Sequence, residues 1–161
     1  VQPQDASSYR NTQGQAFAAY FSQTPSGATT DFAALSNGTS YPVVVDAIHV
    51  TAAAAETVRV YVGNALGVSS GTDVTATNVV AKSVGGQSVG LGTNFWYTDN
   101  SVTVTDTGSV LDVIGCGTAR DTTVYAPQSR IVVPPGKMLW LRAVAGSVAL
   151  EGAVHFYVAV P

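Results

Sequence analysis

Serine is the first residue type of this sequence to consider for nucleophilic chemistry. The pattern G-x-S-x-G, which presents a catalytic serine on a strand-to-helix turn in many hydrolases, occurs at residues 67–71 and 86–90. Neither match is followed by a segment with helical periodicity. Glycine and serine are also so frequent that both matches are expected by chance. We therefore predict no nucleophilic role for Ser69 or Ser88.

His49 and His155 are the only histidines, and each lies in a strand-like run on the side opposite its apolar neighbours. A hydrolytic triad would need one of them beside a serine and an acid. A zinc site would need further ligands at motif spacing, and the single cysteine, Cys116, does not supply them. We expect both imidazoles at a surface or a subunit interface. We predict no catalytic residue, no metal site and no cofactor.

Aromatic residues are the next candidates, as contacts for a partner. Residues 14–21, GQAFAAYF, place Phe17, Tyr20 and Phe21 at the i, i+3, i+4 spacing of one helical turn. Residues 1–30 are otherwise rich in Gln, Ser, Thr, Ala and Gly, so we interpret them as an extended N-terminal arm whose three aromatics bind a partner. The alternative is that these rings close one end of the domain's own core.

A second aromatic group, Phe95-Trp96-Tyr97, lies in a loop-like context beside Asp99. We expect it in the core or at a subunit interface. The alternative is a sugar-binding platform in which Trp96 and Tyr97 stack on a ring and Asp99 binds its hydroxyls.

The elements that must position these residues are strands. Residues 57–63, TVRVYVG, alternate with Val58, Val60 and Val62 on one face. Similar β-branched or alternating runs cover residues 41–51, 74–84, 101–105, 110–114, 130–133, 138–145 and 154–160. Turn signals recur about every 8 to 12 residues, which is typical of a sandwich or barrel. We predict a single all-β domain over residues 31–161, an antiparallel, jelly-roll-like β-sandwich of about eight or nine strands.

Cysteine and charge content restrict the partners. One cysteine cannot form an intrachain disulfide, which is compatible with a reducing cytosol. Charged residues make up 11% of the 161 residues and the net charge is −3, with the five arginines scattered along the chain. Nucleic acid binding needs clustered cations, and a membrane span needs about 18 consecutive apolar residues. We therefore expect neither partner, and we infer from the scarcity of charge that other protein surfaces cover much of the domain.

The C-terminal segment carries a family resemblance. Residues 130–161 contain an apolar strand, Pro134-Pro135-Gly136-Lys137, a strand of large apolar residues and a final Val-x-Phe-x-Val-x-Val strand. Proline at the second position and glycine at the third predict a type II turn between the first two strands. This segment resembles the decoration proteins of bacteriophage capsids, also called cement or head-stabilising proteins, and related small virion β-proteins. The resemblance implies a non-catalytic homotrimer that is made in the host cytoplasm and binds the major capsid protein on the outside of the assembled capsid. It carries over no functional residue.

An alternative function and a test of the arm hypothesis follow from the same features. A receptor- or carbohydrate-binding head domain of a phage tail fibre or spike would share the fold and use the Trp96 group. For the decoration protein, the arm hypothesis predicts that deletion of residues 1–30 leaves a folded β-domain with weakened capsid binding.

Overall fold

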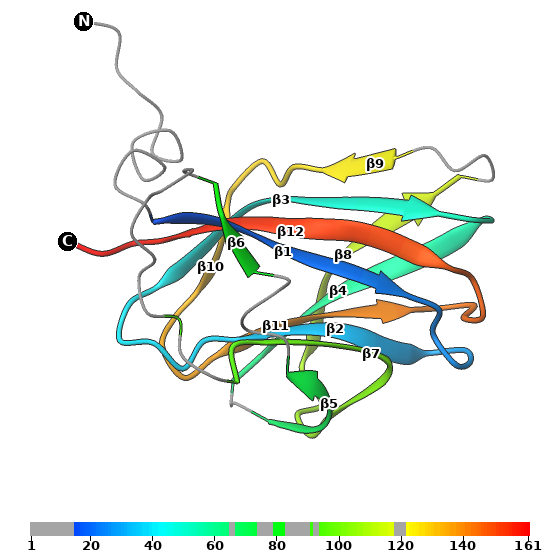
Figure 1. Cartoon of the computed structure of the whole chain (residues 1–161), viewed down its shortest axis with the longest axis horizontal. Helices are drawn as coiled ribbons and strands as arrows, with labels where there is room; N and C mark the ends of the chain where they lie inside the picture. Colours follow the sequence, from blue (N-terminus) through cyan, green and yellow to red (C-terminus); the bar gives the residue numbers. More distant parts are fainter. Residues whose placement is uncertain (1–14, 65–66, 74–78, 83–90, 92–93, 118–121) are drawn as a thin grey trace, which may run out of the picture.

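The computed structural model of the chain describes residues 15–64, 67–73, 79–82, 91, 94–117 and 122–161. These residues form strands and no helix (Figure 1). The strands are β1 (Ala16–Gln23), β2 (Thr30–Ser36), β3 (Val43–Ala52), β4 (Glu56–Gly63), β5 (Val68–Asp73), β6 (Val79–Ala81), β7 (Trp96–Val104), β8 (Ser109–Cys116), β9 (Thr122–Tyr125), β10 (Ile131–Val133), β11 (Met138–Ala143) and β12 (Leu150–Val158).

Two antiparallel sheets pack as a sandwich, which confirms the predicted fold class. One sheet has the order β10-β3-β12-β1-β6, with β9 also paired to β3, and the other has the order β5-β7-β2-β11-β4-β8. We call them sheet A and sheet B. The strand number exceeds the predicted eight or nine because β1, β2, β5 and β9 lie outside the runs that the sequence indicated as strands.

The strand order follows the jelly-roll rule. Strands taken from opposite ends of the chain pair with each other: β1 with β12, β2 with β11, β3 with β10 and β4 with β8. The chain is thus wound as one long hairpin folded over itself, as in a jelly roll. Figure 1 shows the result, with the first strand, β1, beside the last strand, β12.

The core lies between the sheets and is made by alternating residues of both. Val154, Phe156 and Val158 of β12 are fully buried, as the alternation predicts. The Phe156 ring stacks on Phe17 of β1 at a centroid distance of 5.5 Å and contacts Phe95 at 5.4 Å. Such pairs contribute about 1 kcal/mol each beyond the area that they bury.

Strand β1 corrects the prediction of an N-terminal arm. Residues 16–23 are not a helical turn but pair with β12 on one side and β6 on the other. Phe17 and Phe21 are buried in the core, and Tyr20 on the opposite face is 40% exposed. Alanine-rich sequence fits helix or strand, and the ladder with residues 150–157 decides between them. The partner-binding role predicted for Phe17 and Phe21 is therefore wrong, and the rings close the domain's own core.

The predicted domain boundary is also wrong. The break between residues 30 and 31 falls inside β2, and the sandwich already includes β1. Residues 1–14, the rest of the predicted arm, lie outside the described residues.

Two turns show how short polar motifs fix the strand ends. Pro135 and Gly136 occupy the centre of a turn in which Lys137 N donates to Pro134 O at 3.1 Å. Gly136 has a φ of +75°, the left-handed conformation that the third position of a type II turn requires. This turn is the one that the sequence predicts.

Asn37 fixes a second turn from inside the protein. Its buried side chain donates from Nδ2 to Tyr41 O at 2.9 Å and to Val133 O at 2.8 Å. Its Oδ1 accepts from Thr39 N and Thr39 Oγ1. All the hydrogen-bonding capacity of the amide is used, so Asn37 joins the β2 end to β10.

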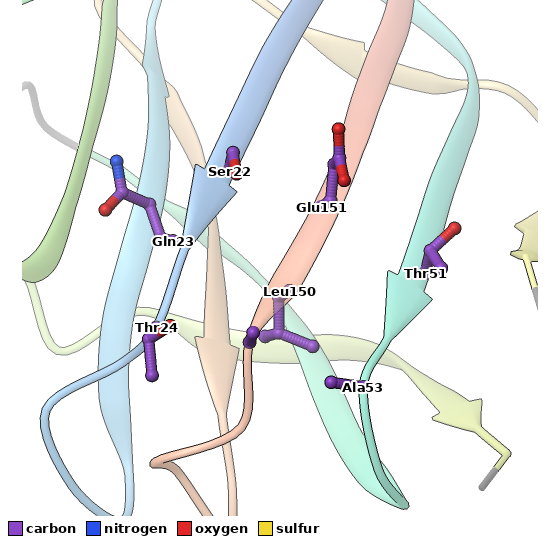
Figure 2. Close-up of a pocket in the computed structure, with 8 residues that line it drawn as sticks. Ser22, Gln23, Thr24, Thr51, Ala53, Leu150 and Glu151 are labelled. Atoms are coloured by element: carbon purple, nitrogen blue, oxygen red, sulfur yellow. The ribbon is translucent and has the colours of Figure 1, made fainter. Parts of the chain in front are cut away.

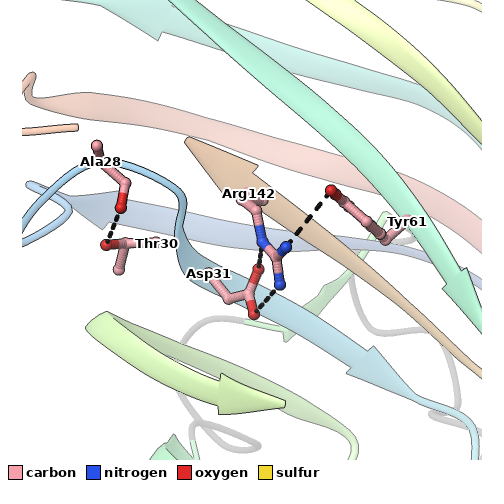
Figure 3. Close-up of polar contacts among 5 residues, drawn as sticks. All are labelled: Ala28, Thr30, Asp31, Tyr61 and Arg142. Atoms are coloured by element: carbon pink, nitrogen blue, oxygen red, sulfur yellow. Dashed lines mark hydrogen bonds and ion pairs between the residues drawn. The ribbon is translucent and has the colours of Figure 1, made fainter. Parts of the chain in front are cut away.

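An ion pair stabilises the outer face of sheet B (Figure 3). Arg142 of β11 donates from Nε to Asp31 Oδ1 at 2.6 Å and from Nη2 to Asp31 Oδ2 at 3.0 Å. Its guanidinium lies 4.5 Å from the ring centroid of Tyr61, which in turn stacks on Trp140. The hydrogen bonds to Asp31 raise the pKa of Arg142, so the guanidinium stays charged. The cross-strand pair joins β2, β11 and β4.

The assignment of β1 to the core can be tested by comparing the stability cost of a substitution on its buried face with that of one on its exposed face. Phe17→Ala is expected to lower the free energy of unfolding by about 3 to 5 kcal/mol, because it opens a cavity beside Phe156. Tyr20→Ala on the same strand is the control and should cost no more than about 1 kcal/mol, because Tyr20 is partly exposed. Urea unfolding measures both. Equal losses for the two variants would contradict the assignment of β1 to the core.

The ion pair gives a second stability prediction. Asp31→Asn keeps the side-chain shape and removes the charge that faces Arg142, so we expect a loss of about 1 to 3 kcal/mol in the free energy of unfolding. Thermal unfolding monitored by circular dichroism measures the change. A loss below about 0.5 kcal/mol, the range of an ordinary surface substitution, would show that the pair adds nothing.

Candidate functional site

The Trp96 group does not form a sugar platform. Trp96 is 0% exposed and its Nε1 donates to Tyr20 O at 2.9 Å, which ties β7 to β1 across the sandwich. Tyr97 is half-buried and donates from its hydroxyl to Asn94 Oδ1. Asp99 lies within β7 and accepts from the backbone of Asn100. The predicted stacking surface is wrong for Trp96, because a buried ring offers no face to a sugar.

Of the two serines considered for nucleophilic chemistry, the structure describes Ser69 and not Ser88. Ser69 lies within β5, on a strand and not on an elbow, and residues 86–90 are outside the described residues. Cys116 is buried, and its burial raises the pKa of the thiol. A thiol with a raised pKa is a weak nucleophile.

Exposed apolar side chains concentrate on the strands at one edge of the sandwich. Among the described residues, eight large hydrophobic side chains are exposed, and five of them are on β8, β9 and β10. These five are Val110, Leu111, Val113, Val124 and Val132. We call this surface the edge face. It belongs to both sheets, because β8 is an edge of sheet B while β9 and β10 pair with β3 in sheet A.

A groove runs through the edge face. Its volume is about 740 Å³, and its apolar walls include Leu111 of β8, Tyr125 of β9 and Val132 of β10. The edges are joined there by Tyr125, which donates from its hydroxyl to Asp112 Oδ2 at 2.6 Å. Burial and this hydrogen bond raise the pKa of Tyr125 to about 12. The same hydrogen bond lowers the pKa of Asp112. The only charge within these three strands is thus already paired with a tyrosine.

Strand β8 lacks the usual protection of a sheet edge. Soluble proteins discourage pairing at an edge with lysine, proline or a bulge. Strand β8 has neither lysine nor proline, and only a bulge at Leu111, which has no Cα partner between Val110 and Asp112. An edge strand with exposed apolar side chains is suited to another protein surface.

Sequence reasoning missed the edge face. It placed a strand at residues 110–114 but gave no reason to expect that strand to be exposed. The available signal was a run of apolar residues, Val110-Leu111, that breaks the alternation of a half-buried strand.

Two polar depressions lie on sheet A. The first, of about 290 Å³, is lined by Ser22 of β1, Glu151 of β12 and Thr51 of β3, with Gln23 and Leu150 nearby (Figure 2). Glu151 Oε1 accepts a hydrogen bond of 2.8 Å from Tyr20, and this bond raises the pKa of the tyrosine. The depression offers hydroxyl, amide and carboxylate groups to a ligand.

The second depression holds both histidines. The rings of His49 on β3 and His155 on β12 lie 4.4 Å apart between centroids. Burial, then the charges of Lys82 and His49, lower the pKa of His155 to about 4. His155 is therefore neutral near pH 7. The expectation that both imidazoles lie at a surface agrees with their place beside this depression.

Among the described residues, no group of three or more His, Cys, Asp or Glu side chains is placed to hold a metal ion. The same residues contain no helix of the length and apolarity needed to cross a membrane.

Comparisons with known proteins give no family assignment: no family model, no curated protein and no solved structure matches the chain.

The low pKa of His155 predicts a pH dependence of stability. Its pKa falls from the ordinary value of 6.5 to about 4 in the folded protein, so the unfolded chain binds the proton more tightly. Stability should be lost as the pH falls from 6.5 to 4, by about 1 kcal/mol, since partial exposure weakens the effect. His155→Gln should remove this part of the pH dependence in urea unfolding at a series of pH values. An unchanged slope in the variant would contradict the assignment.

Proposed function

We propose that the protein is a non-catalytic structural component of a virion, which binds the outside of an assembled capsid and associates with copies of itself as a homotrimer. The edge face carries this proposal. Five exposed apolar side chains lie on β8, β9 and β10, and two of them, Leu111 and Val132, line a groove. Asp112, the only charge on the three strands, also lines it and is paired with a tyrosine. Such a surface is stabilised when another protein covers it.

The jelly roll and the composition support the same function. Jelly rolls are frequent in viral capsids, although they also occur in lectins and cupins, so this part of the support is an analogy of fold. Charged residues make up only 11% of the chain. Interface cores are depleted of charge, and a domain that is covered on several sides needs little of it.

The mechanism is one of linkage. A protein that binds the assembled shell and not its dispersed subunits stabilises the shell by mass action. Association of several copies raises the effective concentration of each contact, so weak individual contacts hold the protein on the capsid. The edge face supplies the self-association in this scheme, and the major capsid protein is the second partner.

A receptor- or carbohydrate-binding domain of a tail fibre or spike is the second candidate. The observation that favours it is the depression beside Tyr20, where Glu151, Ser22 and Thr51 present polar groups next to a partly exposed aromatic ring. In this candidate function the sugar-binding site lies on sheet A and not at Trp96. Saturable binding of a glycan that is lost in Glu151→Ala would favour it over the structural role.

A charge placed on the edge face tests the structural role. Val113→Lys puts an ammonium on β8 at a side chain that is 50% exposed, so folding is expected to survive while self-association is weakened at least tenfold, the equivalent of about 1.4 kcal/mol. Light scattering after size-exclusion chromatography measures the mass of the wild type and the variant. The occupancy of the variant on purified empty capsids should fall together with its self-association.

Val80→Lys is the matched control, because Val80 is 59% exposed but lies on β6, away from the edge face. Its mass and capsid occupancy should equal those of the wild type. A wild-type protein that is monomeric at high micromolar concentration, or equal behaviour of the two lysine variants, would refute assembly through the edge face.

A further inference from the structure

The depression that holds both histidines gathers an unusual share of the chain's nitrogen-bearing side chains. It has a volume of about 510 Å³ and is lined by Asp46, Ala47, His49, Lys82, Pro127, Gln128, Arg130 and His155. The chain has seven lysines and arginines and two histidines in all. Two of those seven cations and both histidines therefore border one depression, in a protein with little charge elsewhere.

Strand pairing fixes the two imidazoles on a rigid floor. His49 is the Cα partner of Ala153, so His155 lies diagonally across from it on the next strand. Alanines at positions 47 and 153 leave room around the rings. Within the part of the chain that the structure describes, the ring nitrogens of both histidines make no hydrogen bond. Each imidazole offers at least one N–H donor in either protonation state, so the pair offers two donors to a ligand.

Two cations stand beside the imidazoles. Arg130 Nε is 3.0 Å from Asp46 Oδ1, and Arg130 Nη1 donates to the Tyr157 hydroxyl at 3.3 Å, which holds the guanidinium in place. Lys82 is anchored through its backbone N, which donates to Ala16 O at 2.8 Å. Its side chain is exposed. With Asp46 counted, the ionised groups around the depression sum to one positive charge.

Burial and the charge of Asp46 act in opposite directions on the pKa values at this site. Burial lowers the pKa of Lys82, and burial together with the charge of Lys82 lowers the pKa of His155. The charge of Asp46 raises both pKa values, and a bound anion would act on them in the same direction as Asp46.

We propose that this depression binds a phosphate-type oxyanion through the Lys82 ammonium, the Arg130 guanidinium and the N–H groups of His49 and His155. Arginine and lysine are the usual cationic partners of phosphate, and neutral N–H donors add directional hydrogen bonds. A divalent metal is the poorer occupant, because Lys82 and Arg130 would repel it and because no three His, Cys, Asp or Glu side chains among the described residues are placed to hold a metal ion. The site shares Pro127, Gln128 and Arg130 with the lining of the edge-face groove, but its anion binding does not depend on the proposed function.

Proton NMR of the histidine rings provides a direct test. The protein has only two histidines, so it gives two Cε1–H resonances that report on this depression and little else. Titration with sodium phosphate at constant pH and ionic strength should shift both resonances to saturation, with a dissociation constant of about 1 mM, as a few partly exposed contacts would give. Sodium chloride in place of phosphate should leave both resonances unshifted.

Two lysine variants distinguish a specific phosphate site from a general electrostatic attraction between the protein and the anion. Lys82→Gln should weaken phosphate binding about threefold to fivefold, the effect of one partly exposed charge. Lys137→Gln is the matched control, because Lys137 Nζ donates to Asn64 O away from the depression. Its affinity should equal that of the wild type. Shifts that do not saturate, or equal weakening in both variants, would overturn the proposal, and so would zinc ions that shift the resonances at lower concentration than phosphate.

The phosphate could be free or attached to a saccharide, and the two sources share the same chemistry. Glucose 6-phosphate should shift the resonances as inorganic phosphate does, while glucose alone should not. Tighter binding of glucose 6-phosphate would assign the site to phosphorylated saccharides, and equal binding would assign it to the free anion. A response to glucose equal to that of its phosphate would overturn the proposal.

Discussion

The pairing of β1 with β12 is the interaction on which the rest of this structure depends. It brings residues 16–23 against residues 150–157, the two ends of the described chain, and places the Phe17 ring on Phe156. Once these ends are joined, the intervening strands pair in order from the outside inward, which is the jelly roll. The contact also joins the strands that are most distant in sequence. Forming it therefore costs a large loop-closure entropy, which is offset only when the core is buried.

The same winding decides which surfaces are left for partners. It puts β8 at the edge of sheet B and the short strands β9 and β10 beside β3 in sheet A, so that the sandwich is least covered where these strands meet. The exposed apolar side chains concentrate there. The flat outer surface of sheet A has a different character, because β1, β3 and β12 carry alternating polar residues such as Glu151 and His155 on that side. One fold thus presents an apolar edge and a polar face, which suit different partners.

Local sequence predicted the strands well where alternation or turn chemistry is strong. The faces of β4 and β12 and the Pro135-Gly136 turn are confirmed, because side chains alternate across a strand and a left-handed residue is needed in that turn. The aromatic spacing of residues 17–21 was ambiguous, since it satisfies a helical turn and an alternating strand at once. Pairing with β12 resolved it, and the predicted arm became part of the core.

What the sequence by itself determined was the class of the protein: all-β, poor in charge, and with no motif for nucleophilic or metal chemistry. Only the tertiary structure decided which residues share a surface. His49 and His155 are more than a hundred positions apart, and Lys82 and Arg130 come from further segments, yet strand register places all four around one depression. The exposure of Val113 is likewise a property of its strand's place at a sheet edge. Alternation within a strand fixes the side on which a residue points, whereas its neighbours across the sheet depend on contacts between distant parts of the chain.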